Sequence, residues 1–148
     1  MKTMDTCLLT SLLIIQICIL STWGAGYTIE EFPICTMPSD QLYPKIDGHI
    51  VVWEDTRNGN NDIYAWDLST KTEIAICTDS AAQERPQIGG NIIAWEDSRN
   101  GNRDIYAYNL STKQEFAVCT EAHNQMTIAV GSGRIAWIDN RSSYEESG

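Results

Sequence analysis

Two pairs of aspartates have a spacing that could hold a metal ion. Asp55 and Asp62 flank one Asn-Gly sequence, and Asp97 and Asp104 flank another. Asn-Gly is a strong signal for a two-residue hairpin turn, which would place the aspartates of each pair opposite each other on adjacent strands. Facing carboxylates repel unless a cation or a hydrogen-bond donor lies between them. Each pair is therefore either a calcium site or part of a structural ion pair.

The residues between the paired aspartates favour the structural alternative. A calcium loop of the D-x-D-x-D-G kind has oxygen ligands at alternate positions. Here Arg57 and Gly59 stand at those positions and supply no side-chain oxygen. We therefore predict that Arg57 or the backbone amides of the turn neutralise the carboxylates. We predict no metal site and no cofactor.

The sequence contains none of the common catalytic residue sets. The motifs G-x-S-x-G, H-E-x-x-H and C-x-x-C do not occur, and the two histidines, His49 and His123, are far apart in the chain. We predict no catalytic residues and a protein that is not an enzyme.

A repeat of 42 residues organises the chain. The offset relates three tryptophans and three cysteines: Trp53, Trp95 and Trp137, and Cys35, Cys77 and Cys119. In the second unit we predict strands at 86–88, 92–96, 104–110 and 115–119, separated by Gly-rich or polar turns. A four-stranded unit of this length is typical of a β-propeller blade. The predicted fold class is all-β, a partial β-propeller of four-stranded antiparallel blades.

The repeated motif is similar to that of a known family. The pattern Trp-Glu-Asp-x-Arg-Asn-Gly-Asn-x-Asp-Ile-Tyr-Ala-x-x-Leu-Ser-Thr, at 53–70 and again at 95–112, resembles the TolB-like repeats of six-bladed β-propellers. These repeats occur in exported and cell-surface proteins of archaea and bacteria. The resemblance implies full blades at about 43–78 and 85–120 and half a blade at 127–141. Residues 27–148 would then form an incomplete propeller whose role is binding.

The first 26 residues have the order of a secretory signal peptide. Lys2 precedes an apolar run from Cys7 to Leu20, and mostly small residues follow at 21–26. The run has 14 residues, fewer than the ~20 that a helix needs to cross a bilayer. We predict cleavage near Gly26 and no stable membrane span afterwards. The protein would be secreted or at the cell surface, or periplasmic in a Gram-negative organism; an uncleaved amino-terminal anchor is the alternative.

Composition limits the partners. The chain has 20 acidic and 10 basic residues and a formal charge of −10. Binding to nucleic acid needs a basic face, so we exclude that class. The hydrophobic fraction of 43% is ordinary for a chain that builds a core.

Residues that recur in every unit are expected to be structural, because each blade needs the same packing while a propeller has one central channel. The tryptophans are therefore predicted to pack between blades. Neighbouring sheets lie about 10 Å apart, too far for a disulfide, so the recurring cysteines are predicted to be small buried hydrophobes. Pairing between molecules through Cys35 or Cys119 is the alternative.

Residues that break the repeat are better candidates for function. They cluster in the connections between units, which we expect at one end of the propeller channel. We predict ligand or partner contacts through four of them: Tyr43, Glu84, Arg85 and His123. The sequons at Asn109 and Asn140 are predicted glycosylation sites in an exported chain.

Three functions from different classes remain open. The first is an exported, non-enzymatic propeller module that binds a protein or a glycan. The second is part of a propeller glycosidase or lyase, and the third is a propeller fragment without independent activity. Counting a lone fourth-type strand at 34–36, two chains would bring two strands too few for a six-bladed ring. Self-association to complete the propeller is a further prediction, and the ring that it forms would be two strands short.

Overall fold

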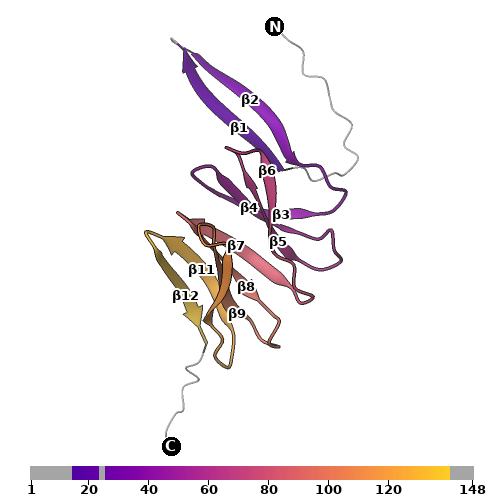
Figure 1. The fold of residues 1–148 in the computed structure, drawn as a ribbon, viewed down its shortest axis with the longest axis vertical. Helices are drawn as coiled ribbons and strands as arrows, with labels where there is room; N and C mark the ends of the chain where they lie inside the picture. Colours follow the sequence, from indigo (N-terminus) through magenta and orange to yellow (C-terminus); the bar gives the residue numbers. More distant parts are fainter. Residues whose placement is uncertain (1–14, 24–25, 141–148) are drawn as a thin grey trace, which may run out of the picture.

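The computed structural model describes residues 15–23 and 26–140, and these form twelve strands and no helix (Figure 1). The strands are β1 (Ile15–Trp23), β2 (Gly26–Cys35), β3 (Gln41–Asp47), β4 (Ile50–Asp55), β5 (Asp62–Asp67), β6 (Thr72–Cys77), β7 (Gln83–Gly89), β8 (Ile92–Asp97), β9 (Asp104–Asn109), β10 (Gln114–Cys119), β11 (Gln125–Gly131) and β12 (Arg134–Asp139).

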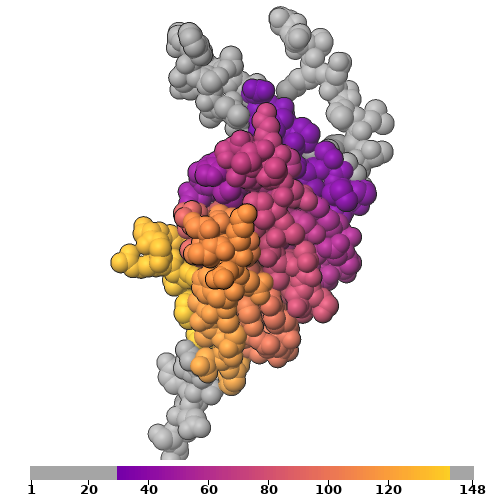
Figure 2. All heavy atoms as spheres, viewed as in Figure 1, coloured from indigo at the N-terminus to yellow at the C-terminus, as the bar shows by residue number. Residues whose placement is uncertain are grey.

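The strands form four antiparallel sheets that follow the chain. We call β3-β4-β5-β6 the first blade, β7-β8-β9-β10 the second blade, β11-β12 the half-blade and β1-β2 the N-terminal hairpin. Figure 1 shows the hairpin at one end and the half-blade at the other, with the two blades between them. Figure 2 shows the half-blade, in yellow, protruding beside the second blade. The predicted fold class, all-β with four-stranded antiparallel sheets, is confirmed.

The N-terminal hairpin differs from the predicted lone strand at 34–36. β1 pairs along its whole length with β2, from Ile15 beside Cys35 to Trp23 beside Gly26. β1 lies within the predicted signal peptide, whose residues 1–14 are outside the described part of the chain. Cleavage near Gly26 would therefore remove β1 and leave β2 against the first blade.

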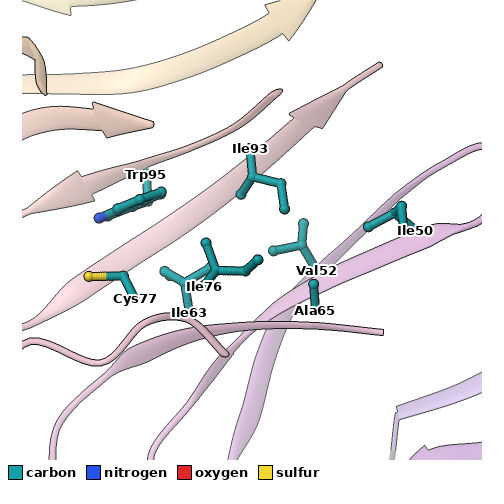
Figure 3. Packing of buried hydrophobic residues seen from close by; sticks show 8 residues of the cluster. All are labelled: Ile50, Val52, Ile63, Ala65, Ile76, Cys77, Ile93 and Trp95. Carbon is teal, nitrogen blue, oxygen red and sulfur yellow. The ribbon is translucent and has the colours of Figure 1, made fainter. Parts of the chain in front are cut away.

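The strands in the middle of each blade are buried on both faces. Side chains of β4 alternate, so Val52 faces the second blade while Trp53 faces Ile34 of the hairpin. Figure 3 shows the first of these interfaces, in which Ile93 and Trp95 of β8 pack on side chains of the first blade. Trp53 and Trp95 are fully buried. Packing between sheets thus accounts for the recurring tryptophans.

The edge strand at the start of each unit contains a β-bulge. We call β3, β7 and β11 the inner strands, because β7 lies next to both of the others. In β3, Tyr43 and Pro44 face the single residue Trp53. Arg85 and Thr127 occupy the same bulge position in the next two units. All three bulge residues have left-handed backbones, with φ of 51°, 54° and 57° in chain order.

The loops that contain Asn-Gly are not the predicted two-residue turns. Residues 56–61 and 98–103 form six-residue connections. Each begins with a turn in which the glycine amide donates to a carbonyl three residues earlier, at 3.0 Å for Gly59 and Thr56. Of these two residues only the glycine has a positive φ, 95° at Gly59, and the Asn58 side chain donates to Asp62 Oδ2 at 2.6 Å. The predicted register is nonetheless correct, and Asp55 pairs with Asp62.

Candidate functional site

Asp55 is fully buried and is held by donors from the protein. The Arg57 guanidinium donates to Oδ2 at 2.7 Å and the Arg57 amide to Oδ1 at 2.9 Å, as predicted. Trp53 Nε1 and the Ser39 hydroxyl each donate at 3.0 Å. Burial alone would raise the pKa of Asp55, but these hydrogen bonds together outweigh it, and the pKa lies below its ordinary value.

The opposite carboxylate, Asp62, has different donors. Asn58 Nδ2 donates to Oδ2 at 2.6 Å, and Asn60 Nδ2 donates to Oδ1 at 3.0 Å. Burial raises the pKa of Asp62, and the nearby charge of Asp55 adds to this. The two facing carboxylates therefore have different partners: Arg57 neutralises Asp55, and the side-chain amides of Asn58 and Asn60 donate to Asp62. Among the residues that the structure describes, no group of three His, Cys, Asp or Glu is placed to bind a metal.

Arg57 and its counterpart in the second blade, Arg99, also contact the recurring cysteines Cys35 and Cys77. Arg99 Nη2 lies 3.1 Å from Cys77 Sγ and 2.7 Å from Asp97 Oδ2, and its guanidinium stacks 4.1 Å above the Tyr106 ring. Cys77 is buried and carries a free thiol. Desolvation raises its pKa to about 12, which makes the thiolate rare at neutral pH. Cys35 is likewise free and buried, so the prediction of small buried groups holds for these two residues, whereas Cys119 is partly exposed.

A buried glutamate links each blade to the bulge of the next. Glu54 accepts a hydrogen bond from the backbone amide of Arg85, 31 residues further along the chain. Glu96 accepts one from the amide of Thr127 at 2.9 Å, across the same separation. Desolvation raises the pKa of Glu54. The left-handed bulge residues are therefore fixed through their own amides by the preceding blade.

The bulge side chains meet at a shallow hollow of about 230 Å³. We define the inner-strand surface by its exposed or partly exposed lining residues: Tyr43, Lys45, Arg85, Gln87 and Thr127. Two of the four predicted contact residues, Tyr43 and Arg85, are thus brought together, with exposures of 56% for Tyr43 and 46% for the Arg85 side chain. They lie within β3 and β7, not in the connections between units as predicted, because each inner strand begins before its bulge. Arg85 Nη1 donates to the buried Glu96 at 3.0 Å, which orients the guanidinium.

Glu84 and His123, the other two predicted contact residues, do not line this hollow. Glu84 accepts a hydrogen bond from Arg103 Nη2 at 3.1 Å. His123 is exposed in the connection before β11, and its carbonyl accepts from Asn102 and Gln125 side chains.

Sequence reasoning missed several residues of this region. Lys45 and Gln87 also change from unit to unit, and that difference could have identified them. Arg103 replaces Asn61 within an otherwise matching block, and it reaches both Glu84 and Glu96. The sequence shows the substitution at Arg103, but it does not show that the side chain pairs with Glu84, 19 residues earlier.

The predicted glycosylation sites lie on different connections. Asn109 ends β9, and its side-chain oxygen accepts from the amides of Ser111 and Thr112. Asn140 is exposed after β12, and the rest of its sequon is outside the described residues. Glycosylation stays a prediction. The described residues contain no helix with the length and apolarity to cross a membrane.

The blades have counterparts among solved structures. TolB from Acinetobacter baumannii aligns with a TM-score of 0.62 and 20% identity, over 86% of this chain and 36% of its own. A protein of Agrobacterium tumefaciens assigned as TolB aligns with a TM-score of 0.54 and 18% identity, over 76% of this chain and 45% of its own. No protein-family model and no curated protein matches the sequence.

These likenesses show the fold. The sheets are blades of a β-propeller, and the chain holds part of one. It spans less than half the length of either TolB structure.

Proposed function

We propose that this chain is part of an exported, non-enzymatic β-propeller whose inner-strand surface binds a protein partner. The observation that carries the proposal is the left-handed backbone at Tyr43, Arg85 and Thr127. A non-glycine residue there is strained by on the order of 1–3 kcal/mol, and glycine would relieve the strain. The three units instead keep three different side chains around one hollow. Lys71 and Lys113 also have left-handed backbones, so the functional signal is the gathering of three different strained side chains around one hollow and not the strain alone.

The residue types and the shape of the surface favour a protein over a small molecule. Tyrosine and arginine are enriched among the residues that dominate protein interfaces. The hollow of about 230 Å³ is smaller than the ~300–1,000 Å³ of most small-ligand pockets. An extended contact with Tyr43 and Arg85 at its centre fits these features.

Charge indicates what the partner presents. Lys45 and Arg85 are both exposed on the inner-strand surface, and the buried Glu96 balances the Arg85 charge at 3.0 Å, so Lys45 supplies the excess positive charge of the hollow. The whole chain, in contrast, carries a formal charge of −10. A local basic surface on an acidic protein favours partners with carboxylates at the matching position and disfavours basic ones.

The buried acids support binding rather than catalysis. Glu54 and Glu96 hold backbone amides of the next unit, and Asp55 and Asp97 hold arginines. Each of these carboxylates is committed to a structural hydrogen bond. We therefore assign the surface no acid–base chemistry.

Site-specific photo-crosslinking in cells of the source organism tests the proposal. The full chain would carry p-benzoylphenylalanine at Tyr43, and at Lys71 in a control. Lys71 is a matched control because it also has a left-handed backbone, φ 56°, and lies in the exposed turn between β5 and β6. A protein crosslinked from position 43 alone is then purified, and its affinity is measured with wild-type chain, Tyr43→Gly, Arg85→Gly and Lys71→Gly.

Glycine at these positions removes the side chain without opposing the backbone. We expect Tyr43→Gly and Arg85→Gly to weaken binding at least tenfold, while Lys71→Gly leaves it unchanged. We also expect Tyr43→Gly to unfold no more easily than wild type. No crosslinked protein at position 43, or unchanged affinity in both site variants, would refute the proposal and favour a propeller fragment without independent activity.

Export is supported by Lys2 and the apolar run from Cys7 to Leu20. Intact-mass measurement of the protein recovered from the cell envelope or medium tests it. A species that begins near residue 27 is expected. A full-length species found only in the cytoplasm would contradict export.

A further inference from the structure

A larger hollow, about 630 Å³, lies between the first and second blades. It lies at the turns that join β3 to β4, β5 to β6, β7 to β8 and β9 to β10, whereas the bulges lie near the start of β3 and β7. Residues 47–50, 67, 70, 72 and 74 of the first blade line one side, and residues 90, 91, 108, 110, 111 and 113 of the second blade line the other. Its volume is within the ~300–1,000 Å³ typical of small-ligand pockets. We call it the inter-blade pocket.

The pocket combines an apolar floor with a polar rim. Ile74 and Tyr108, both partly buried, belong to the floor. Asp47 and Asp67 of the first blade and Lys113 of the second belong to the rim. Apolar surface beside a few polar groups that fix orientation is the usual composition of a ligand site.

The acidic rim residues are not demanded by the repeat. Asp47 stands where the next units have Gly89 and Gly131, and Asp67 stands where the second unit has Asn109. A two-residue connection follows the first position in all three units, and a four-residue connection follows the second position in both full blades. The carboxylates are therefore additions of the first unit to a framework that folds without them.

Both carboxylates keep hydrogen-bonding capacity. Asp47 Oδ2 accepts from the Gly90 amide at 2.5 Å, and Asp67 Oδ1 accepts from the amide and hydroxyl of Ser69 at 2.8 and 2.5 Å. Within the described residues, no donor contacts the second oxygen of either side chain. The Ser69 hydroxyl bond lowers the pKa of Asp67, so this carboxylate is an acceptor at neutral pH.

We propose that the inter-blade pocket binds a sugar unit of a neutral glycan. Sugar hydroxyls can donate to Asp47 and Asp67 and accept from Lys113, while the apolar face of the ring packs on Tyr108 and Ile74. The rim has one more carboxylate than it has ammonium groups, which disfavours a sugar acid or a phosphate. A wholly apolar ligand would leave the rim groups without partners.

The experiment uses the full chain and two kinds of probe. A printed array of neutral and sialylated glycans identifies candidates, and calorimetry with the matching free oligosaccharide gives the affinity. Asp47→Gly and Asp67→Asn install the residues of the other units, so both variants are expected to fold. Tyr43→Gly, on the inner-strand surface, is the control outside the pocket.

We expect neutral glycans to bind, sialylated ones to bind more weakly, and Asp67→Asn and Asp47→Gly each to weaken binding at least tenfold. Tyr43→Gly should leave glycan affinity unchanged, whereas it is expected to weaken binding of the protein partner. A negative result for glycan binding would therefore leave the proposed protein-binding function untouched, and a negative result for protein binding would leave the glycan site untouched. No bound neutral glycan, stronger binding of sialylated glycans, or full affinity in both pocket variants would overturn the inference.

Discussion

Two buried aspartates that face each other across β8 and β9 should differ in how much their loss destabilises the protein. Asp97 and Asp104 are paired in register, and both are fully buried. Replacing each with alanine separates two explanations of the acidic pair. If protein donors hold the carboxylates, the two costs differ, because the donors differ. If a cation bridged them, both losses would be similar and would depend on that cation.

Asp97 has the larger expected cost. It accepts four hydrogen bonds, from Trp95 Nε1 at 2.8 Å, the Arg99 amide at 3.0 Å, and Arg99 Nε and Nη2 at 2.9 and 2.7 Å. Asp97→Ala leaves the buried indole N–H without this acceptor and the guanidinium with a lost counter-charge. Breaking a buried ion pair costs about 3–5 kcal/mol. That is a large share of the ~5–15 kcal/mol by which a domain is stable.

Asp104 should cost less. Its two donors are the side-chain amides of Asn100 and Asn102, and each donor keeps another acceptor. Asn100 also donates to Tyr106 Oη at 3.0 Å, and Asn102 also donates to the Glu121 carbonyl at 3.1 Å. Removing Asp104 also removes a buried charge. We estimate about 1–2 kcal/mol for Asp104→Ala.

Urea unfolding monitored by tryptophan fluorescence measures both variants, with calcium chloride and with chelator. The expected order is wild type, Asp104→Ala, then Asp97→Ala, and the same order in both buffers. The reasoning would be refuted if Asp104→Ala cost as much as Asp97→Ala. A wild-type midpoint that rises strongly with calcium would also refute it.

Two further predictions concern titrating groups. The pKa of Glu54 is raised above 4.5 by burial, so wild type loses stability as pH rises from about 4.5 through the raised value. Melting temperatures between pH 4 and 8 should therefore show Glu54→Gln gaining on wild type with rising pH; a constant difference would contradict this. Cys77, buried and with a pKa of about 12, should resist a maleimide in the folded protein and react only in denaturant. Partly exposed Cys119 should react first, and equal labelling of the two would contradict the burial argument.

The sequence predicts what is local and what repeats. Strand positions followed from alternating patterns and turn residues, and the register of Asp55 with Asp62 followed from their symmetric placement around Asn58-Gly59. The turn type was wrong because the pattern specifies only that the chain reverses. Asn58 stabilises the loop through a 2.6 Å bond to Asp62 and not through a left-handed backbone.

Contacts between units could not be predicted in the same way. The hydrogen bond that Glu54 accepts from the Arg85 amide joins residues 31 apart, which alternation and turn signals do not relate. The bulge at Tyr43 places two residues opposite one, which alternation alone does not reveal. The N-terminal hairpin was missed because an apolar run around Ile15–Trp23 satisfies both a signal peptide and a strand.

The glutamate that holds the next unit's bulge gives the propeller a direction. Glu54 and Glu96 each precede their amide donor in the chain, so the acceptor is synthesised before the residue it holds. The half-blade has Ile138, 52% exposed, at the equivalent position. A unit placed after it would find no carboxylate for its inner bulge. Attachment of a further unit to β12 would therefore need contacts other than this hydrogen bond.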